Sequence, residues 1–269
     1  MLAALRSDAH LTVSGLVLEK GQTTASGFSS GLPITITDAF CTPISGSGGA
    51  VCARGNLIIR DVQLIDNSTA GNHARGGGAF VAGNLLMQNS RVSQNSTFGR
   101  FADGAGILAV NDVSVTASSI ESNTTYGYSA GGGGFRAFGH AEISSSTISQ
   151  NSQVYAPPQP IFLRPYFPKG GGFSAASASI ADSVITGNST YDNRSSGGGF
   201  FSYGSSEIRL STISGNTTSG SDSDGGGFSS SGDVEVSSSK ISGNVTVGNG
   251  GGFRANNLLF KDSFVDEII

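Results

Sequence analysis

The feature that most constrains this fold is an asparagine that returns at a nearly fixed interval. Successive intervals of 28, 28, 28, 37, 28 and 28 residues separate its copies, at Asn67, Asn95, Asn123, Asn151, Asn188, Asn216 and Asn244. A fixed period of this length is typical of repeat proteins, in which each unit packs on its neighbours because it cannot bury its apolar face alone. The one long interval places an insertion in that repeat.

Apolar side chains keep constant positions relative to this asparagine. An aliphatic residue stands three positions before it, at Leu64, Val92, Ile120, Ile148, Ile185, Ile213 and Ile241. Another stands eight positions before it, at Ile59, Met87, Val115, Ile143, Ile180, Ile208 and Val236. A third apolar position follows each glycine cluster, at Phe80, Ile107, Phe135, Phe173, Phe200, Phe228 and Phe253. Because alternate residues of a strand point to the same side, we expect three short strands per repeat with these side chains inside.

Composition favours strands and turns over helices. The chain has 41 glycines, and a glycine costs about 1 kcal/mol in a helix interior. The sequence therefore predicts an all-β fold, a right-handed parallel β-helix (β-solenoid) with coils of about 28 residues. We expect one β-helix over residues 1–269, with an irregular first coil and insertion over 1–47, regular coils over 48–253, an insertion loop over 153–169 and an incomplete last coil over 254–269.

Two tetrapeptides of the repeat resemble those of a known group of surface proteins. Gly48-Gly49-Ala50-Val51 and Ile213-Ser214-Gly215-Asn216 are similar to the Gly-Gly-Ala-(Ile/Leu/Val) and Phe-x-x-Asn repeats of the polymorphic outer membrane proteins of chlamydiae and related autotransporter-type adhesins. Similar coils occur in the wider pectate-lyase-like β-helix superfamily. The resemblance implies an adhesive or structural shaft that is secreted or lies on the cell surface.

The repeat asparagines allow two interpretations. Pointing inward, their amides would form a structural ladder from coil to coil. Pointing outward, six of them would be N-glycosylation acceptors, because threonine follows two residues on at Thr69, Thr97, Thr125, Thr190, Thr218 and Thr246. Asn193, followed by Ser195, is a further acceptor. A buried side chain cannot carry a sugar, so the two roles exclude each other at any one asparagine.

The cysteines and the charge balance bear on compartment and partners. Cys41 and Cys52 are the only two cysteines, and we expect a disulfide between them, with two free buried thiols as the alternative. The net charge of −4 gives no basic footprint for nucleic acid. The sequence contains no apolar run long enough to span a membrane. Residues 1–8 do not resemble a secretion signal, so we expect such a signal to lie outside this sequence.

One outward column of acids is the strongest candidate for catalysis. Glu142, Glu207 and Glu235 each stand nine residues before a repeat asparagine, and Arg209 lies on the same strand face as Glu207. Carboxylates that converge on neighbouring coils are what glycoside hydrolysis requires. Stacked acids beside a basic residue also form an ordinary solvated salt bridge, which is the interpretation we favour.

Other ionisable residues give weaker signals. Asp222 and Asp224 supply two carboxylates, fewer than the six to eight oxygens of a calcium shell. His10, His73 and His140 fall at different phases of the repeat, which favours surface or turn positions. We therefore expect no metal, no cofactor and no catalysis. The leading hypothesis is an extracellular structural or adhesive β-solenoid, and the alternative is a carbohydrate-active or carbohydrate-binding β-helix that acts on polysaccharide.

The insertion and the two ends suggest partners. The insertion concentrates prolines and aromatic residues, and we expect it to project as a contact loop for a carbohydrate or a surface receptor through Tyr155, Phe162, Arg164, Tyr166 and Phe167. Both ends of the sequence resemble coils without caps. We therefore expect end-to-end self-association into a filament, or continuation into a longer chain.

Overall fold

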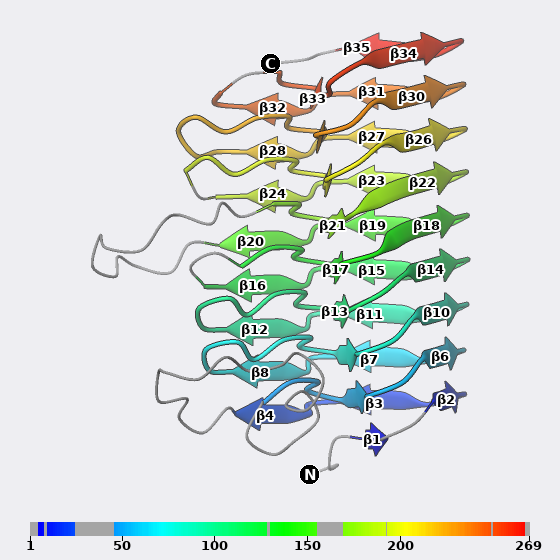
Figure 1. Cartoon of the computed structure of the whole chain (residues 1–269), viewed down its shortest axis with the longest axis vertical. Helices are drawn as coiled ribbons and strands as arrows, with labels where there is room; N and C mark the ends of the chain where they lie inside the picture. The colour runs from blue at the N-terminus through cyan, green and yellow to red at the C-terminus, as the bar shows by residue number, and fades with distance from the viewer. Residues whose placement is uncertain are drawn as a thin grey trace.

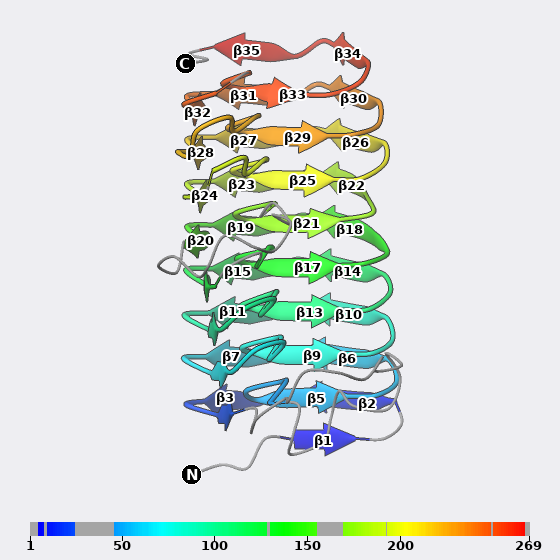
Figure 2. The same ribbon diagram turned by 60° about the vertical axis from the view of Figure 1, so that its left-hand side comes forward.

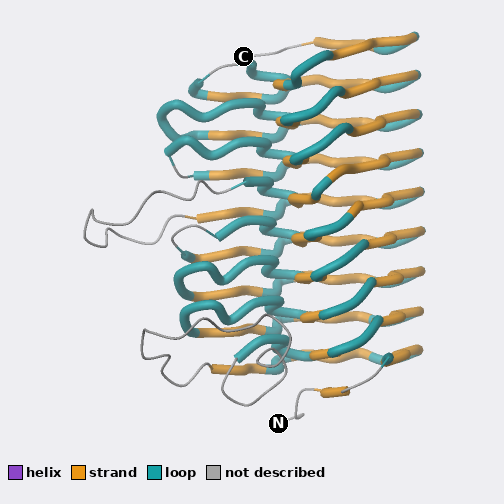
Figure 3. The backbone as a smooth tube through the Cα atoms, viewed as in Figure 1, coloured by secondary structure: helices purple, strands orange, loops and turns teal. Residues whose placement is uncertain are grey.

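The computed structural model describes residues 5–7, 10–24, 46–127, 130–154, 169–191, 193–248 and 250–266. Every regular element in these ranges is a β-strand, and the strands are numbered β1 to β35. Figure 3 shows short strands that alternate with loops along the whole tube. Among the described residues there is no helix of the length and hydropathy needed to cross a membrane.

The strands form four sheets. Sheet A contains β1 (Leu5–Ser7), β5 (Val51–Ala53), β9 (Ala79–Val81), β13 (Ile107–Ala109), β17 (Phe135–Ala137), β21 (Phe173–Ala175), β25 (Phe200–Ser202), β29 (Phe228–Ser230) and β33 (Phe253–Arg254). Sheet B contains β2 (Leu11–Ser14), β6 (Leu57–Arg60), β10 (Leu85–Gln88), β14 (Val113–Thr116), β18 (His140–Ser144), β22 (Ser177–Ala181), β26 (Ser206–Arg209), β30 (Val234–Ser237) and β34 (Leu258–Lys261).

Sheets C and D complete the coil. Sheet C contains β3 (Val17–Glu19), β7 (Gln63–Ile65), β11 (Arg91–Ser93), β15 (Ser119–Glu121), β19 (Thr147–Ser149), β23 (Val184–Thr186), β27 (Thr212–Ser214), β31 (Lys240–Ser242) and β35 (Phe264–Asp266). Sheet D contains β4 (Gln22–Thr24), β8 (Ser68–Ala70), β12 (Ser96–Phe98), β16 (Thr124–Tyr126), β20 (Ser152–Val154), β24 (Ser189–Thr190), β28 (Thr217–Thr218) and β32 (Val245–Thr246).

Each strand pairs in parallel with its equivalent one coil away, so the chain climbs the rod coil by coil (Figure 1, Figure 2). In sheet B, for example, Glu207 of β26 faces Glu235 of β30. This arrangement confirms the predicted parallel β-solenoid with coils of about 28 residues. Sheet D adds a fourth strand where three were expected. Its residues are mostly serine and threonine, so they carry no apolar alternation that would reveal a strand.

The aliphatic columns of sheets B and C fill the interior of the rod. Leu64, Val92, Ile120, Ile148, Ile185, Ile213 and Ile241 have no exposed surface, and the second column, from Ile59 to Val236, is at most 1% exposed. Full burial of one such side chain stabilises the fold by roughly 1.5–3 kcal/mol. Because every coil contributes at the same two phases, the core is continuous along the axis.

Sheet A contributes a column of stacked aromatic rings. Phe135, Phe173, Phe200 and Phe228 are fully buried, and their successive ring centroids lie 4.7, 5.0 and 5.3 Å apart with nearly parallel planes. Phe253 continues the column at 5.6 Å from Phe228 and is partly exposed. Strand pairing sets this spacing, since the coil repeat and an offset ring stack require similar separations.

Phe80 is fully buried, as predicted for a core residue, but its predicted place in this column is wrong. In the strand register, Ala79 pairs with Ile107 and Ile107 pairs with Phe135, which leaves Phe80 beside Leu108. Alternation along β9 therefore turns Phe80 to the opposite face of sheet A, where it is buried in a separate small cluster with Cys52 and Leu108. The cause is the residue after the glycine cluster, which is alanine in this coil, isoleucine in the next and phenylalanine from Phe135 on.

The glycine cluster forms the corner that leads into sheet A. Gly197 has a φ of +70°, which an L side chain adopts only under strain. A Cβ atom at the next residue, Gly198, would lie 2.4 Å from the carbonyl oxygen of Gly226 and 2.6 Å from that of Thr217. Neighbouring coils can approach this closely only if the residue there has no side chain.

Described strands at both ends of the rod join the common sheets. Within residues 1–47, predicted as an irregular first coil with an insertion, β2 and β3 pair with β6 and β7 in the common register, with Leu11 beside Leu57 and Leu18 beside Leu64. The expected insertion in this coil agrees with the separation of 46 residues between Gly21 and its partner Asn67. At the other end, β33, β34 and β35 continue sheets A, B and C.

Candidate functional site

The seven repeat asparagines form a buried ladder along the rod. Each is at most 1% exposed. At Asn216, the backbone N–H and the side-chain Nδ2 both donate to Oδ1 of Asn244, each at 3.0 Å, and Nδ2 also donates to the carbonyl oxygen of Ile185 at 2.9 Å. The preceding Asn188 donates to Oδ1 of Asn216 in the same way. Each amide from Asn67 to Asn216 therefore joins three successive coils, and Asn244 joins two.

This burial removes the glycosylation alternative at the ladder positions of the folded chain. A glycan on Nδ2 would replace hydrogen bonds inside the rod and would have no path to solvent. Asn193 differs, because its side chain is exposed and its Oδ1 accepts a hydrogen bond from the backbone N–H of Ser221 at 3.0 Å. Asn193 is therefore the accessible acceptor among those identified in the sequence.

A second polar ladder, made of serines, was missed by sequence reasoning. Ser90 Oγ accepts from the backbone N–H of Val62 at 3.0 Å and donates to the carbonyl oxygen of Gln88 at 2.7 Å. The pattern continues up the rod at Ser118, Ser146, Ser183, Ser211, Ser239 and Ser263. The signal was present, because each of these up to Ser239 stands five residues before a repeat asparagine.

The acid column proposed as a catalytic alternative lies on the outer face of sheet B. Glu142 and Glu207 are exposed, and Glu207 faces Glu235 across the β26–β30 pair. Glu235 forms an ion pair with Nζ of Lys261, one coil further on, at 2.6 Å. Arg209 was expected from the sequence to balance the acids. The basic partner of Glu235 is instead Lys261, which sequence reasoning did not consider.

The histidines lie apart and are engaged separately. His10 Nδ1 accepts from the backbone N–H of Asn56 at 2.9 Å, and His140 Nδ1 lies 2.8 Å from Ser177 Oγ. His73 stacks on Phe101 with ring centroids 5.0 Å apart. Burial, followed by the nearby Arg75 guanidinium, lowers the pKa of His73 below 6.5. Among the described residues, no group of three or more His, Cys, Asp or Glu side chains could hold a metal ion.

Two other predictions fall partly or wholly outside the described residues. Cys52 is disulfide-bonded, whereas Cys41 lies outside the described ranges. The contact-loop residues of the insertion also lie outside them, at Tyr155, Phe162, Arg164, Tyr166 and Phe167.

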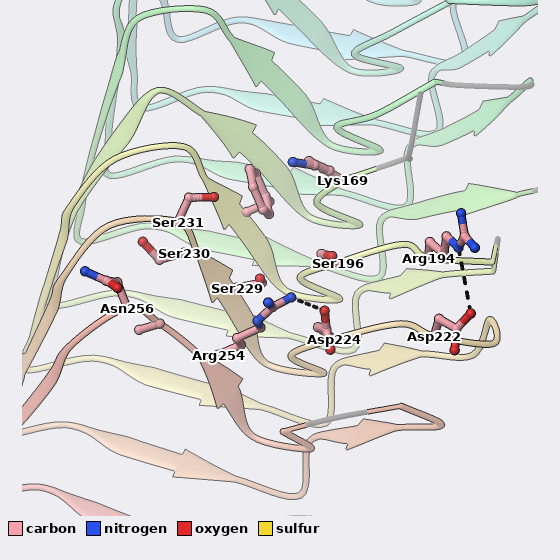
Figure 4. Close-up of a pocket in the computed structure, with 12 residues that line it drawn as sticks. Lys169, Arg194, Ser196, Asp222, Asp224, Ser229, Ser230, Ser231, Arg254 and Asn256 are labelled. Atoms are coloured by element: carbon pink, nitrogen blue, oxygen red, sulfur yellow. Dashed lines mark hydrogen bonds and ion pairs between the residues drawn. The ribbon is translucent and has the colours of Figure 1, made fainter. Parts of the chain in front are cut away.

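The structure reveals an open trough that the sequence argument did not find. It has a volume of about 690 Å³ and lies on the outer face of sheet A, toward the C-terminal end of the rod (Figure 4). We call it the sheet A trough, and its floor and walls include Lys169, Phe201, Asp224, Ser229, Ser231 and Arg254. Strands β25, β29 and β33 supply the floor. One wall is a column in which Lys169, Ser196 and Asp224 pair in parallel.

Charged side chains in the trough are paired or packed on rings. The Asp224 carboxylate accepts a hydrogen bond from the Arg254 guanidinium, and Arg194 Nε lies 3.7 Å from Asp222 Oδ2. Lys169 Nζ lies 3.9 Å from the Phe201 ring centroid and 4.6 Å from that of Tyr203. These cation–π contacts hold an ammonium group at one side of the trough.

Further along sheet A, a buried ion pair flanks the same outer face. Arg136 Nη1 lies 2.8 Å from Asp103 Oδ1, and both side chains are less than 10% exposed. Arg75 Nε approaches the other carboxylate oxygen of Asp103 at 3.8 Å, and the Arg136 guanidinium lies 4.6 Å from the Phe138 ring centroid. Loss of one member of a buried pair leaves an uncompensated charge at a cost of about 3–5 kcal/mol. This cluster therefore fixes the outer face of sheet A at β17.

Comparisons with family models, curated proteins and solved structures give no match for this chain. The parallel β-solenoid architecture accordingly rests on the strand pairing itself. The likeness to adhesin repeats is a resemblance of short motifs.

Proposed function

We propose that this chain is a structural or adhesive β-solenoid of the cell exterior, a rod without catalytic activity. The observation that carries the proposal is that the residues which recur with the repeat point inward or close a corner. The asparagine ladder, the aliphatic columns and the phenyl column all join one coil to the next. A chain whose repeated positions serve stacking is suited to span distance, and its resemblance to adhesin repeats points to the same role.

The disulfide supports the extracellular part of the proposal. Cys52 is disulfide-bonded, and disulfides persist mainly in oxidising compartments such as the cell exterior. The pairing of carboxylates supports the absence of catalysis. Asp103, Asp222, Asp224 and Glu235 each lie beside an arginine or a lysine, so these carboxylates are engaged in ion pairs.

A coil deletion tests the structural role. Removing residues 68–95 takes out one period and joins Asn67 to Ser96, which preserves the local Asn-Ser-Thr sequence. Because strands of one sheet are about 4.8 Å apart, we expect a folded rod shorter by about 5 Å in small-angle X-ray scattering. Loss of the β signal in circular dichroism would show that the coils are not interchangeable units of a shaft.

The alternative function is a carbohydrate-active β-helix that uses the acid column of sheet B. Its site would consist of Glu207 and the neighbouring Arg209 and Glu235. It predicts that the chain cleaves a polysaccharide and that Glu207→Gln abolishes this cleavage. A screen of soluble polysaccharides for new reducing ends would detect this activity. Turnover that is lost in the Glu207 variant would overturn the non-catalytic proposal.

End-to-end association into a filament, or continuation of the rod in a longer chain, is part of the same proposal. Core residues at the ends, such as Leu258 and Phe260 in β34, are only partly buried, whereas their equivalents inside the rod are fully buried. Unpaired strand edges invite further pairing, and head-to-tail contacts do not close into a ring. Light scattering should show particle mass increasing with concentration. A constant monomer mass would refute self-association.

A further inference from the structure

From β17 to β33, the floor of sheet A's outer face alternates between large and small side chains from one coil to the next. In strand register, Arg136 is followed by Ser174, Phe201, Ser229 and Arg254. Two positions along the same strands and the loops that follow them, the order is Phe138, Ala176, Tyr203, Ser231 and Asn256. Large groups therefore recur every second coil, about 10 Å apart at roughly 4.8 Å per coil.

This alternation creates a recess with a ring at one side and a guanidinium at the other. Ser229 and Ser231 leave the space of the sheet A trough between Phe201 and Arg254, and Tyr203 packs against Phe201 at the edge of the trough. The Tyr203 side chain is 43% exposed, and its ring meets that of Phe201 edge to face, with centroids 4.8 Å apart at 79°. Tyr203 is thus held in one orientation while part of its surface stays open to a ligand.

The chemistry of the recess fits a ligand with apolar faces and a rim of hydroxyl groups. An aromatic ring packs against apolar C–H surface, while serine hydroxyls and the Arg254–Asp224 pair offer hydrogen-bond donors and acceptors in fixed places. The charged groups of the trough are nearly balanced, with Lys169, Arg194 and Arg254 against Asp222 and Asp224. That balance does not suit a polyanion such as nucleic acid.

We propose that the sheet A trough binds a linear glycan, which runs along the rod axis and is not cleaved. One sugar ring packs on Tyr203, and its hydroxyls reach the serines and the Arg254–Asp224 pair. The two-coil spacing of the large side chains suits a polymer that presents the same face on every second sugar. This inference rests on the adhesive role proposed above, because it assigns a ligand class to that role.

The test measures binding of two hexasaccharides to the full chain by calorimetry. Cellohexaose is neutral, and a hyaluronan hexasaccharide carries a carboxylate on every second sugar, so the pair distinguishes a neutral from an acidic ligand. We expect saturable binding of at least one of them, weakened about tenfold in Tyr203→Ala and in Arg254→Ala. Tyr191→Ala is the matched control, because Tyr191 is 53% exposed but follows β24 of sheet D, away from the outer face of sheet A.

Two outcomes would overturn glycan binding at the trough. One is the absence of saturable binding of either hexasaccharide at millimolar concentration, with the folded state verified by circular dichroism. The other is equal weakening in Tyr191→Ala and Tyr203→Ala, which would show that exposed tyrosines act without a defined site. Counting reducing ends after binding separates this inference from the proposed function. New ends would refute the non-catalytic role, whereas a lack of binding leaves the rod intact as a structural element.

Discussion

The ladder predicts that one buried amide controls the stability of several coils. Asn216→Ala removes four side-chain hydrogen bonds, two accepted by Oδ1 and two donated by Nδ2. It leaves two buried donors without a partner, namely the backbone N–H of Asn188 and one N–H of its Nδ2. Each unsatisfied buried group costs about 1–3 kcal/mol. We therefore expect a loss of about 2–6 kcal/mol in the free energy of unfolding.

Urea unfolding followed by circular dichroism measures this loss as a lower midpoint. Asn84→Ala is a matched control, because Asn84 Oδ1 also accepts a backbone N–H from the next coil, that of Asp112, at 3.2 Å, but on the exposed surface. Water can replace that bond, so we expect a change of about 0.5 kcal/mol or less. Equal midpoints for the two variants would refute the reasoning, since burial is the property that separates them.

A charge at the same position gives a pH-dependent version of this test. Asn216→Asp keeps an acceptor for Asn188 but turns a second carboxylate oxygen toward the carbonyl of Ile185 and Oδ1 of Asn244. Burial and these acceptors raise the folded-state pKa of the new carboxyl above its unfolded value. The folded state then binds the proton more tightly, so the penalty is largest at neutral pH and falls as the pH drops through the folded-state pKa. Stability that does not respond to pH in this range would contradict a buried position.

Further predictions concern the corner, the core and modification. Gly198→Ala brings a Cβ within 2.4 Å of a backbone oxygen and should cost about 3 kcal/mol of stability. Gly187→Ala should cost about 1 kcal/mol, because the atom nearest to its Cβ is 3.7 Å away. Equal losses of melting temperature in the two variants would contradict the close approach at Gly198. Ile213→Asp should cost at least ~3 kcal/mol and Ser214→Asp under ~1 kcal/mol, and thermal denaturation that ranks them the other way would reverse the inward assignment. After expression through a glycosylating secretory pathway, mass spectrometry of the folded fraction should find glycan at Asn193 and none on the ladder; ladder glycans in folded protein would disprove burial.

The scaffold was predictable because its residues repeat. Asn67 to Asn244 and Ile120 to Ile241 recur at one phase each, and identical residues at one phase must stack when the coils do. The error at Phe80 shows the limit of this argument. Phe80 was assigned to the phenyl column because it is a phenylalanine close to the repeat position of that column. It lies one residue beyond that position, and a shift of one residue moves a side chain to the other face of a strand. Only the pairing of Ala79 with Ile107 reveals the shift.

The trough was not predictable by the same reasoning, for a physical reason. The outward position after each buried phenylalanine of sheet A has no neighbour it must match, so it varies as Arg136, Ser174, Phe201, Ser229 and Arg254. A search for periodic residues passes over such a position because nothing in it repeats. Stacking imposes one residue type on inward positions, whereas an outward position is free to be shaped by what it contacts. In a β-solenoid, the departures from the repeat on an outward face are therefore where binding chemistry should be sought.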